Sequence, residues 1–212
     1  PYRRQRQMCI RDRSITMDEH TIQCYNGTVH GQEDFYSAFA SSCNCAFADM
    51  GTALGGSSIR KTSEDLLFNR KLPLTSYKKS SFSLDGSSGT PLVMQTAIGQ
   101  GNTLVSPAHM ALITSAIANG GVLMKPYLID SVVNNNGDPV KETEPEVYKR
   151  LITTNEANVL GKLMKNVVDY GTASALSGRG YTAAGKTGSA EFDESGSSHS
   201  SVSYTHLTLP TI

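Results

Sequence analysis

The two ends of the sequence can be encoded by the two complementary strands of one DNA segment. This limits how much of the chain is expected to belong to the folded protein. Residues 3–12 read RRQRQMCIRD and residues 202–211 read VSYTHLTLPT. The first segment can be back-translated into a DNA whose reverse complement encodes the second, codon for codon, and this DNA resembles the transposase adapter of sequencing libraries. Because technical scars are excluded from fold reasoning, we expect 1–13 and 202–212 to be translated adapter sequence. The remaining residues, 14–201, are then expected to be part of one domain, cut at both ends.

The charge balance changes once the two ends are set aside. The whole chain of 212 residues has 19 basic and 19 acidic side chains. The ends hold five arginines and one aspartate, so 19 less 5 leaves 14 basic groups, 19 less 1 leaves 18 acidic groups, and the net charge becomes −4. A mildly acidic chain is not typical of a nucleic-acid binder, and no apolar run reaches the roughly 18 residues of a membrane span. We therefore expect no nucleic-acid partner and no membrane-spanning segment within this sequence.

The hydrophobic pattern favours an α+β fold, with more helices than strands. Helical spacing over 33–54 is interrupted by the polar residues 41–44, which predicts two helices that meet at a tight polar junction. Helix starts and turn signals place further elements. We expect helices at 58–68, from Ser106-Pro107 and from the Thr153/Glu156 capping box, strands at 21–24, 127–133 and 182–192, a hairpin turn at 134–138, and a long Ser-rich surface loop at 72–90. His109, in the first turn of its helix, is expected at the surface or in the cap.

Three short segments could carry chemistry, although each has an ordinary structural explanation when taken alone. Ser42-Cys43-Asn44 lies at the helix junction, and it could be a simple helix cap. Lys186-Thr187-Gly188 lies in a strand of small residues, where a solvated lysine is a common device against aggregation. Gly99 and Gly101 flank a turn that needs positive φ. His20, His30, Cys24, Cys43 and Cys45 match no zinc spacing, so no metal is expected.

The combination of two of these segments is far more specific. Ser-x-Asn on a helical lobe, followed about 144 residues later by Lys-Thr-Gly on a strand, resembles two of the three signatures of penicillin-binding proteins and serine β-lactamases. The segments GQGNTLVSPAHMALITSAIANGGVLMKPYLI and AAGKTGSAEF resemble the transpeptidase domain of monofunctional, class B penicillin-binding proteins of Gram-positive anaerobes. The resemblance implies a β-lactamase/transpeptidase-like fold, in which an antiparallel sheet packs against a helical lobe, here incomplete.

The resemblance also implies roles for the Ser-x-Asn residues. A serine nucleophile near neutral pH needs a base and an oxyanion hole to attack an amide. In the family, a Ser-x-x-Lys motif supplies the nucleophile and the base. Ser42 would relay a proton between that lysine and the leaving amine, and Asn44 would bind a backbone amide of the donor peptide.

The strand residues are implied to hold the other end of the substrate. Lys186 would place a positive charge opposite the terminal carboxylate of the stem peptide or of a β-lactam, and Thr187 would hydrogen-bond that carboxylate. Gly188 would leave room for the substrate to lie along the strand. The backbone N–H of Ser189 would be one donor of the oxyanion hole.

The nucleophile itself is not identified in this sequence. The segments 58–61 and 76–79 both fit Ser-x-x-Lys, but both follow the Ser-x-Asn segment, whereas the family's nucleophile precedes it. We therefore reject Ser58 and Ser76 and expect the nucleophilic serine upstream of Ser14. This fragment is accordingly expected to be inactive on its own.

The implied reaction of the parent protein is acyl transfer from the D-Ala-D-Ala end of a peptidoglycan stem peptide to an amine of a neighbouring strand, and β-lactams would acylate the same serine. No cofactor is implied. The parent would act on the extracytoplasmic face of the cell membrane, held by an N-terminal anchor upstream, and could join a cell-wall synthesis complex. Two alternatives stay open, namely a penicillin-sensing receptor domain and a class D-like serine β-lactamase.

Overall fold

The computed structural model describes the backbone of residues 14–191 and 198–206 and the side chains of residues 14–189. Helices and short strands are interspersed along the chain, as an α+β fold requires. The helices are α1 (Phe35–Ser41), α2 (Asn44–Leu54), α3 (Gly56–Asp65), α4 (Thr90–Ala97), α5 (Pro107–Ala118) and α6 (Thr154–Asp169), with short 3-10 turns η2 (Tyr25–Gly27) and η3 (Ser174–Leu176). The strands are β1 (Ser14–Met17), β2 (His20–Gln23), β3 (Val122–Met124), β4 (Ser131–Val133), β5 (Pro139–Glu142), β6 (Val147–Arg150), β7 (Ala183–Glu191) and β8 (Ser198–His206).

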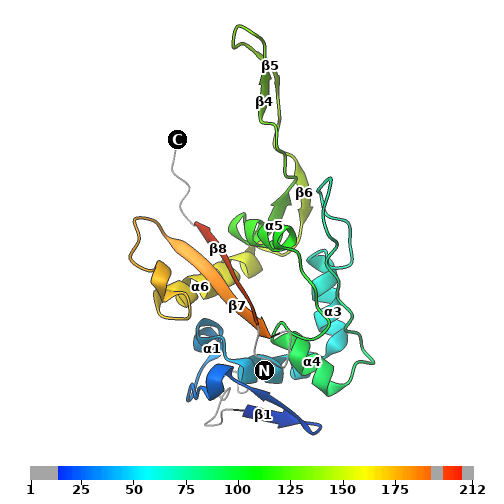
Figure 1. Ribbon diagram of the computed structural model, residues 1–212, viewed down its shortest axis with the longest axis vertical. Coiled ribbons are helices and arrows are strands. Elements are labelled where there is room, and N and C mark those ends of the chain that lie inside the picture. Colours follow the sequence, from blue (N-terminus) through cyan, green and yellow to red (C-terminus); the bar gives the residue numbers. More distant parts are fainter. Residues whose placement is uncertain (1–13, 192–197, 207–212) are drawn as a thin grey trace.

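The described strands form four antiparallel pairs, which are β1 with β2, β3 with β6, β4 with β5, and β7 with β8. The longest pair, β7 with β8, crosses the body of the molecule, with α6 packed against β7 and α1 packed against α6 (Figure 1). An antiparallel sheet against a helical lobe is the arrangement that the family resemblance implies. β8 includes residues 202–206 of the segment predicted to be adapter-derived; that origin is a property of the DNA and stays a prediction.

Two apolar clusters hold the helical lobe against the strands. One joins α6 to β7 through Val167, Val168, Ala173 and Ala183, with Phe39 of α1 packed against it. The other joins the end of β2 to the junction of α1 and α2, and its buried members are Cys24, Ala38, Cys43, Cys45 and Ala46. The junction between the two helices therefore rests on a buried base.

Local sequence signals form the helix starts as expected. Thr153 Oγ1 accepts a hydrogen bond from the N–H of Glu156, and the Glu156 carboxylate accepts one from the N–H of Thr153 at 2.7 Å, which completes the predicted capping box of α6. At α5, Ser106 Oγ accepts from the N–H of His109, and Pro107 occupies the first turn. The first helical segment divides at residues 42–43, so the prediction of two helices at a tight junction is confirmed.

The prediction that His109 lies at the surface is wrong, although its main-chain N–H does take part in the cap of α5. Its side chain is fully buried, its ring packs 4.8 Å from that of Phe68, and its Nε2 lies 2.7 Å from the carbonyl oxygen of Leu66. That carbonyl follows the end of α3, where main-chain acceptors lack partners within the helix. Burial lowers the pKa of His109, because the charged imidazolium loses its hydration.

The segment 72–90 has no helix or strand before Thr90, but it is not a plain surface loop. Leu72, Ser80 and Leu84 are buried, and Ser80 Oγ accepts a hydrogen bond from the N–H of Ser106. The helix α4, which begins directly after this segment, was not predicted, although Pro91 in its first turn is a start signal. None of the described helices is long and apolar enough to cross a membrane.

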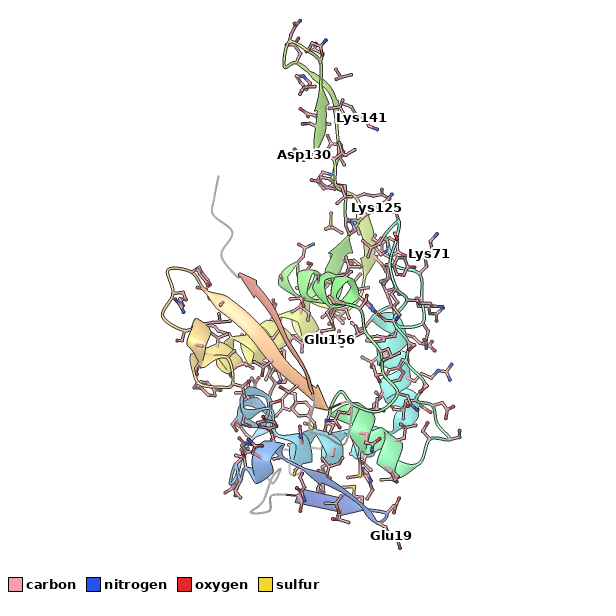
Figure 2. All side chains as sticks on the ribbon, in the orientation of Figure 1. Glu19, Lys71, Lys125, Asp130, Lys141 and Glu156 are labelled. Carbon is pink, nitrogen blue, oxygen red and sulfur yellow. The ribbon has the colours of Figure 1, made fainter. Side chains whose placement is uncertain are left out.

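The hairpin of β4 and β5 extends far from the body of the molecule (Figures 1 and 2). Every residue of β4 and β5 is exposed, and Leu128, which precedes the hairpin, is 100% exposed. The predicted turn at 134–138 is present, with Gly137 at a φ of 88°. The hairpin is therefore a local structure with little packing behind it.

Candidate active site

The junction of α1 and α2 presents Ser42 in an unusual backbone conformation. Ser42 ends α1 with φ 57° and ψ 46°, in the left-handed region that favours glycine. The N–H of Cys43 donates to the carbonyl of Ala38 at 3.0 Å, so the turn satisfies a main-chain acceptor at the helix end. A non-glycine residue held in this region costs about 1–3 kcal/mol, and such strain often marks a functional position.

Lys186 of β7 reaches this junction from a distant part of the sequence. Its Nζ donates to Ser42 Oγ at 2.8 Å, across 144 residues of chain, and also to the carbonyl oxygen of Thr187 at 2.8 Å. The ammonium lies 5.9 Å from the centre of the Phe39 ring. Burial lowers the pKa of Lys186 to about 8, because a charged ammonium loses its hydration there. The first and last predicted site segments therefore meet at one hydrogen bond.

The other predicted site residues lie close to this pair in the sequence, and the side chains of Asn44 and Thr187 have different hydrogen-bond partners. Asn44, at the start of α2, donates from Nδ2 to the carbonyl oxygen of Gln23 at 2.9 Å, so its amide is held at the end of β2. The Thr187 hydroxyl lies 2.6 Å from that of Thr172. Gly188 and Ser189 follow on the same strand and are exposed. Among the described strands, β7 pairs only with β8.

The two rejected Ser-x-x-Lys segments lie outside this group. Ser58 is exposed on α3, and Ser76 is exposed in the loop that follows it. Neither makes any of the hydrogen bonds given above for Ser42 and Lys186. The predicted position of the nucleophile, upstream of Ser14, lies outside the described residues.

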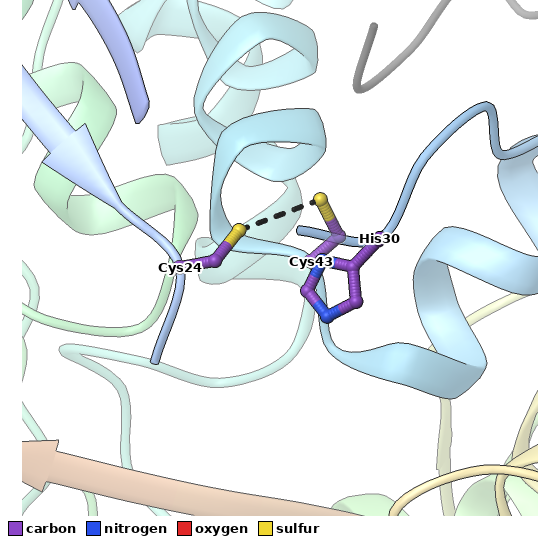
Figure 3. A group of neighbouring side chains, drawn as sticks. All are labelled: Cys24, His30 and Cys43. Carbon is purple, nitrogen blue, oxygen red and sulfur yellow. Dashed lines mark hydrogen bonds between the residues drawn. The ribbon is translucent and has the colours of Figure 1, made fainter. Parts of the chain in front are cut away.

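A cluster of cysteine and histidine lies beneath the junction, and sequence spacing did not reveal it. The ligand atoms of Cys24, His30 and Cys43 lie within 4.8 Å of one another, and the Sγ atoms of Cys24 and Cys43 are 3.7 Å apart (Figure 3). Among the described residues, this is the group of histidine, cysteine and acidic side chains whose ligand atoms lie this close together. The members come from the end of β2, the following loop and the helix junction, so only the fold brings them together.

Cys45 extends the same cluster. Its Sγ lies 3.5 Å from that of Cys24, and both thiols are free and buried. The hydrogen bond between them lowers the pKa of Cys24 and raises that of Cys45, because one thiolate in the pair is stabilised by the other thiol and a second would be repelled. Two members of the cluster, Cys43 and Cys45, alternate with Ser42 and Asn44 along the chain.

Thr172 is a site residue that the sequence analysis did not identify. It lies between α6 and η3, far in sequence from both predicted motifs, and it contacts Thr187 through its hydroxyl. The only sequence signal for this residue was the run of small residues Gly171-Thr172-Ala173 just after a helix. Such a run is typical of an ordinary helix end.

Comparison with known proteins places this arrangement in one family. The family model described as "Penicillin binding protein transpeptidase domain" matches residues 7–209. Stage V sporulation protein D of Bacillus subtilis is 29% identical over 181 residues, which cover 82% of this chain and 27% of that protein. The peptidoglycan D,D-transpeptidase PbpA of Mycolicibacterium smegmatis is 27% identical over 174 residues, which cover 81% of this chain and 35% of that protein. The chain thus spans between a quarter and about a third of the length of these relatives.

Solved structures have the same fold. The D,D-transpeptidase domain of a peptidoglycan glycosyltransferase from Eggerthella lenta superposes with a TM-score of 0.83 at 24% identity, over 96% of this chain and 52% of that one. The ceftriaxone acyl-enzyme complex of penicillin-binding protein A from M. tuberculosis has a TM-score of 0.82 at 22% identity, over 96% of this chain and 47% of that one. The two motifs that meet at Ser42 and Lys186, the fold and the family match agree, and the chain belongs to the penicillin-binding protein transpeptidase domain family.

Proposed function

We propose that the protein containing this chain is a peptidoglycan D,D-transpeptidase that works by serine acyl transfer and is acylated by β-lactams. The observation that carries the proposal is the hydrogen bond from Lys186 Nζ to Ser42 Oγ, which joins the two family motifs across 144 residues. The names of the relatives support the reaction class, since one is a D,D-transpeptidase and a solved neighbour is a β-lactam acyl-enzyme.

The reaction has two acyl-transfer steps. A serine upstream of Ser14 attacks the carbonyl carbon of the penultimate D-alanine, an ester bond forms, the amide C–N bond breaks, and D-alanine leaves with the serine proton. An amine of a neighbouring strand then attacks the ester, and the serine recovers a proton from that amine. Ser42 is well placed to carry protons in both directions, because its hydroxyl already accepts a hydrogen bond from Lys186 and keeps its own proton to donate.

The strand β7 supplies the groups that bind the substrate. Lys186 and Thr187 provide a positive charge and a hydroxyl for the terminal carboxylate of a stem peptide or β-lactam. Gly188 and Ser189 are exposed on this strand, where a peptide could add by main-chain hydrogen bonds. The Ser189 N–H is the proposed oxyanion donor, and Asn44 is the proposed ligand for the donor peptide's amide.

The proposed setting follows from the substrate. Stem peptides ending in D-Ala-D-Ala lie outside the cytoplasmic membrane, so the full-length protein is proposed to act at the extracytoplasmic face through an N-terminal anchor, in contact with other cell-wall synthesis proteins. The charge balance supports no nucleic-acid partner, and the proposed reaction needs no cofactor.

Covalent labelling with fluorescent penicillin tests this function in the full-length protein. We expect Lys186→Ala to reduce the second-order acylation rate by orders of magnitude, because the carboxylate loses its cation and Ser42 its hydrogen-bond donor. The matched control is Lys141→Ala on the exposed strand β5, which should acylate like the wild type. Near-normal acylation of Lys186→Ala would contradict the assigned role. Rapid release of hydrolysed drug would identify a β-lactamase, and a stable adduct without D-alanine release from a stem-peptide analogue would identify a sensor.

The pH dependence of acylation tests the charge on Lys186. With a pKa of about 8, this side chain is cationic below pH 8 and neutral above it. The acylation rate by a carboxylate-bearing β-lactam at low concentration should therefore fall as pH rises through 8, about tenfold per pH unit at the limit, since the free enzyme loses the cation. A rate that stays level from pH 7 to pH 10 would show that the positive charge is not required.

A further inference from the structure

Gly171 and Thr172 form a short connection that contacts both halves of the candidate site. The Thr172 N–H donates to the carbonyl oxygen of Ala40 at 3.1 Å, two residues before Ser42 in the chain. The Thr172 hydroxyl lies 2.6 Å from that of Thr187, directly after Lys186. One residue thus bridges the last turn of α1 and the strand β7.

The main-chain contact depends on the absence of a side chain at Gly171. A Cβ at this position would lie 2.3 Å from the Ala40 carbonyl oxygen and 2.9 Å from the Val167 Cα. The Ala40 carbonyl belongs to the last turn of α1, where acceptors have no partner within the helix. The N–H of Thr172 supplies that partner, so the connection fixes the end of α1 from outside the helix.

The hydroxyl contact sets what Thr187 can offer a ligand. A threonine hydroxyl has one hydrogen to donate and two lone pairs to accept with. If Thr172 donates to Thr187, the hydrogen of Thr187 stays available for a carboxylate; without Thr172, that hydroxyl turns freely and binds water. Thr172 is exposed, so its hydroxyl adds little to the stability of the fold.

We propose that Thr172 is a positioning residue of the acyl-transfer site, which donates to Thr187 Oγ1 and so directs the Thr187 hydrogen toward the substrate carboxylate. This inference rests on the proposed function, because it assigns Thr187 to the carboxylate. Thr172 acts through Thr187 and through the end of α1, and it does not contact the reacting atoms.

The test uses the full-length protein and compares benzylpenicillin with its methyl ester. Thr172→Val removes the hydroxyl while keeping the shape, Thr172→Ser keeps the hydroxyl, and Ser174→Ala is the control for a change in the same exposed segment. A lost neutral hydrogen bond is worth about 1 kcal/mol, so we expect Thr172→Val to acylate about fivefold more slowly with benzylpenicillin. Thr172→Ser should recover most of the rate, and the methyl ester should react equally with all four proteins.

The outcomes separate this inference from the function on which it rests. If the wild type forms no covalent adduct with benzylpenicillin, the proposed function fails. The positioning role fails if the wild type is acylated and Thr172→Val has the same acylation rate. It also fails if Thr172→Val slows acylation by the methyl ester by the same factor, or if Thr172→Ser does not recover the rate. Equal melting temperatures of the valine and serine variants, together with a weaker half-saturation for benzylpenicillin in the valine variant alone, would support it.

Discussion

The candidate site and the hairpin of β4 and β5 are built in opposite ways. The site depends on contacts between segments far apart in sequence, such as Lys186 with Ser42 and Thr172 with Ala40. The hairpin depends on contacts between neighbouring segments of the chain, and the Asn134 side chain accepts from the N–H groups of Asn136 and Asp138 in the turn. The site therefore requires distant segments of the chain to pack together, whereas the hairpin requires almost none of that packing.

The two regions also differ in how they treat strained backbone. The hairpin places Gly137 at its positive φ, which glycine adopts without steric cost. The site places Ser42 at a positive φ, and so keeps a hydroxyl at a position where glycine would have the lower steric energy. The hairpin thus follows local backbone preferences, whereas the site departs from them at Ser42, the residue proposed to relay protons.

The largest expected difference between the regions is in the cost of losing a leucine. Leu163 on α6 is 1% exposed, whereas Leu128 before the hairpin is 100% exposed. Leu163→Ala should lower the free energy of unfolding by about 2–5 kcal/mol, because it leaves a cavity. Leu128→Ala should change it by less than about 0.5 kcal/mol. Thermal unfolding of the two variants measures the contrast, and a large loss in Leu128→Ala would show that the hairpin is packed against another part of the full-length protein.

A pair of glycines sharpens the comparison inside the site region. Gly171→Ala forces a Cβ against the Ala40 carbonyl, so we expect a loss of about 1–3 kcal/mol in unfolding free energy. Gly161→Ala, in the middle of α6 with nothing within 4 Å of the new Cβ, should instead gain about 0.5–1 kcal/mol from higher helix propensity. Opposite shifts in melting temperature are expected. Shifts of the same sign would contradict the close approach at Gly171.

The smallest expected effect concerns the strain at Ser42. Ser42→Gly and Ser42→Ala both remove the hydroxyl, but only glycine adopts φ 57° without a steric penalty. The glycine variant should therefore be about 1 kcal/mol more stable than the alanine variant, while both lose acylation. Urea unfolding compares the two, and equal stabilities would mean that the backbone at Ser42 is not strained.

Local signals in the sequence predicted local structure well. The capping box of Thr153 and Glu156, the Ser106 cap and the turn before Asp138 depend on neighbouring residues, and all three are present. The pairing of Ser42 with Lys186 was anticipated only through the family resemblance, because no spacing rule joins residues 144 apart. The roles assigned to the site residues stay predictions.

The features that sequence reasoning missed all depend on packing between distant segments. His109 was predicted to lie at the surface, but its ring nitrogen Nε2 lies 2.7 Å from the carbonyl oxygen of Leu66. The cysteine cluster contains residues from the end of β2, from a loop and from a helix junction. Thr172 is identified as a site residue only by its hydrogen bonds to Ala40 and Thr187. Such contacts have no signature in the residues that immediately surround each member.

The separation of Ser42 and Lys186 has a consequence for the order of folding. Contacts between residues distant in the chain form late, because the entropy of closing a long loop must be overcome first. Helices α1 and α2 can form early with their junction open, but the Lys186 ammonium arrives only when β7 docks. During refolding of the full-length protein, helical circular dichroism should thus return before the proposed reactivity with penicillin. An intermediate that holds the helical lobe alone would be structured yet unreactive.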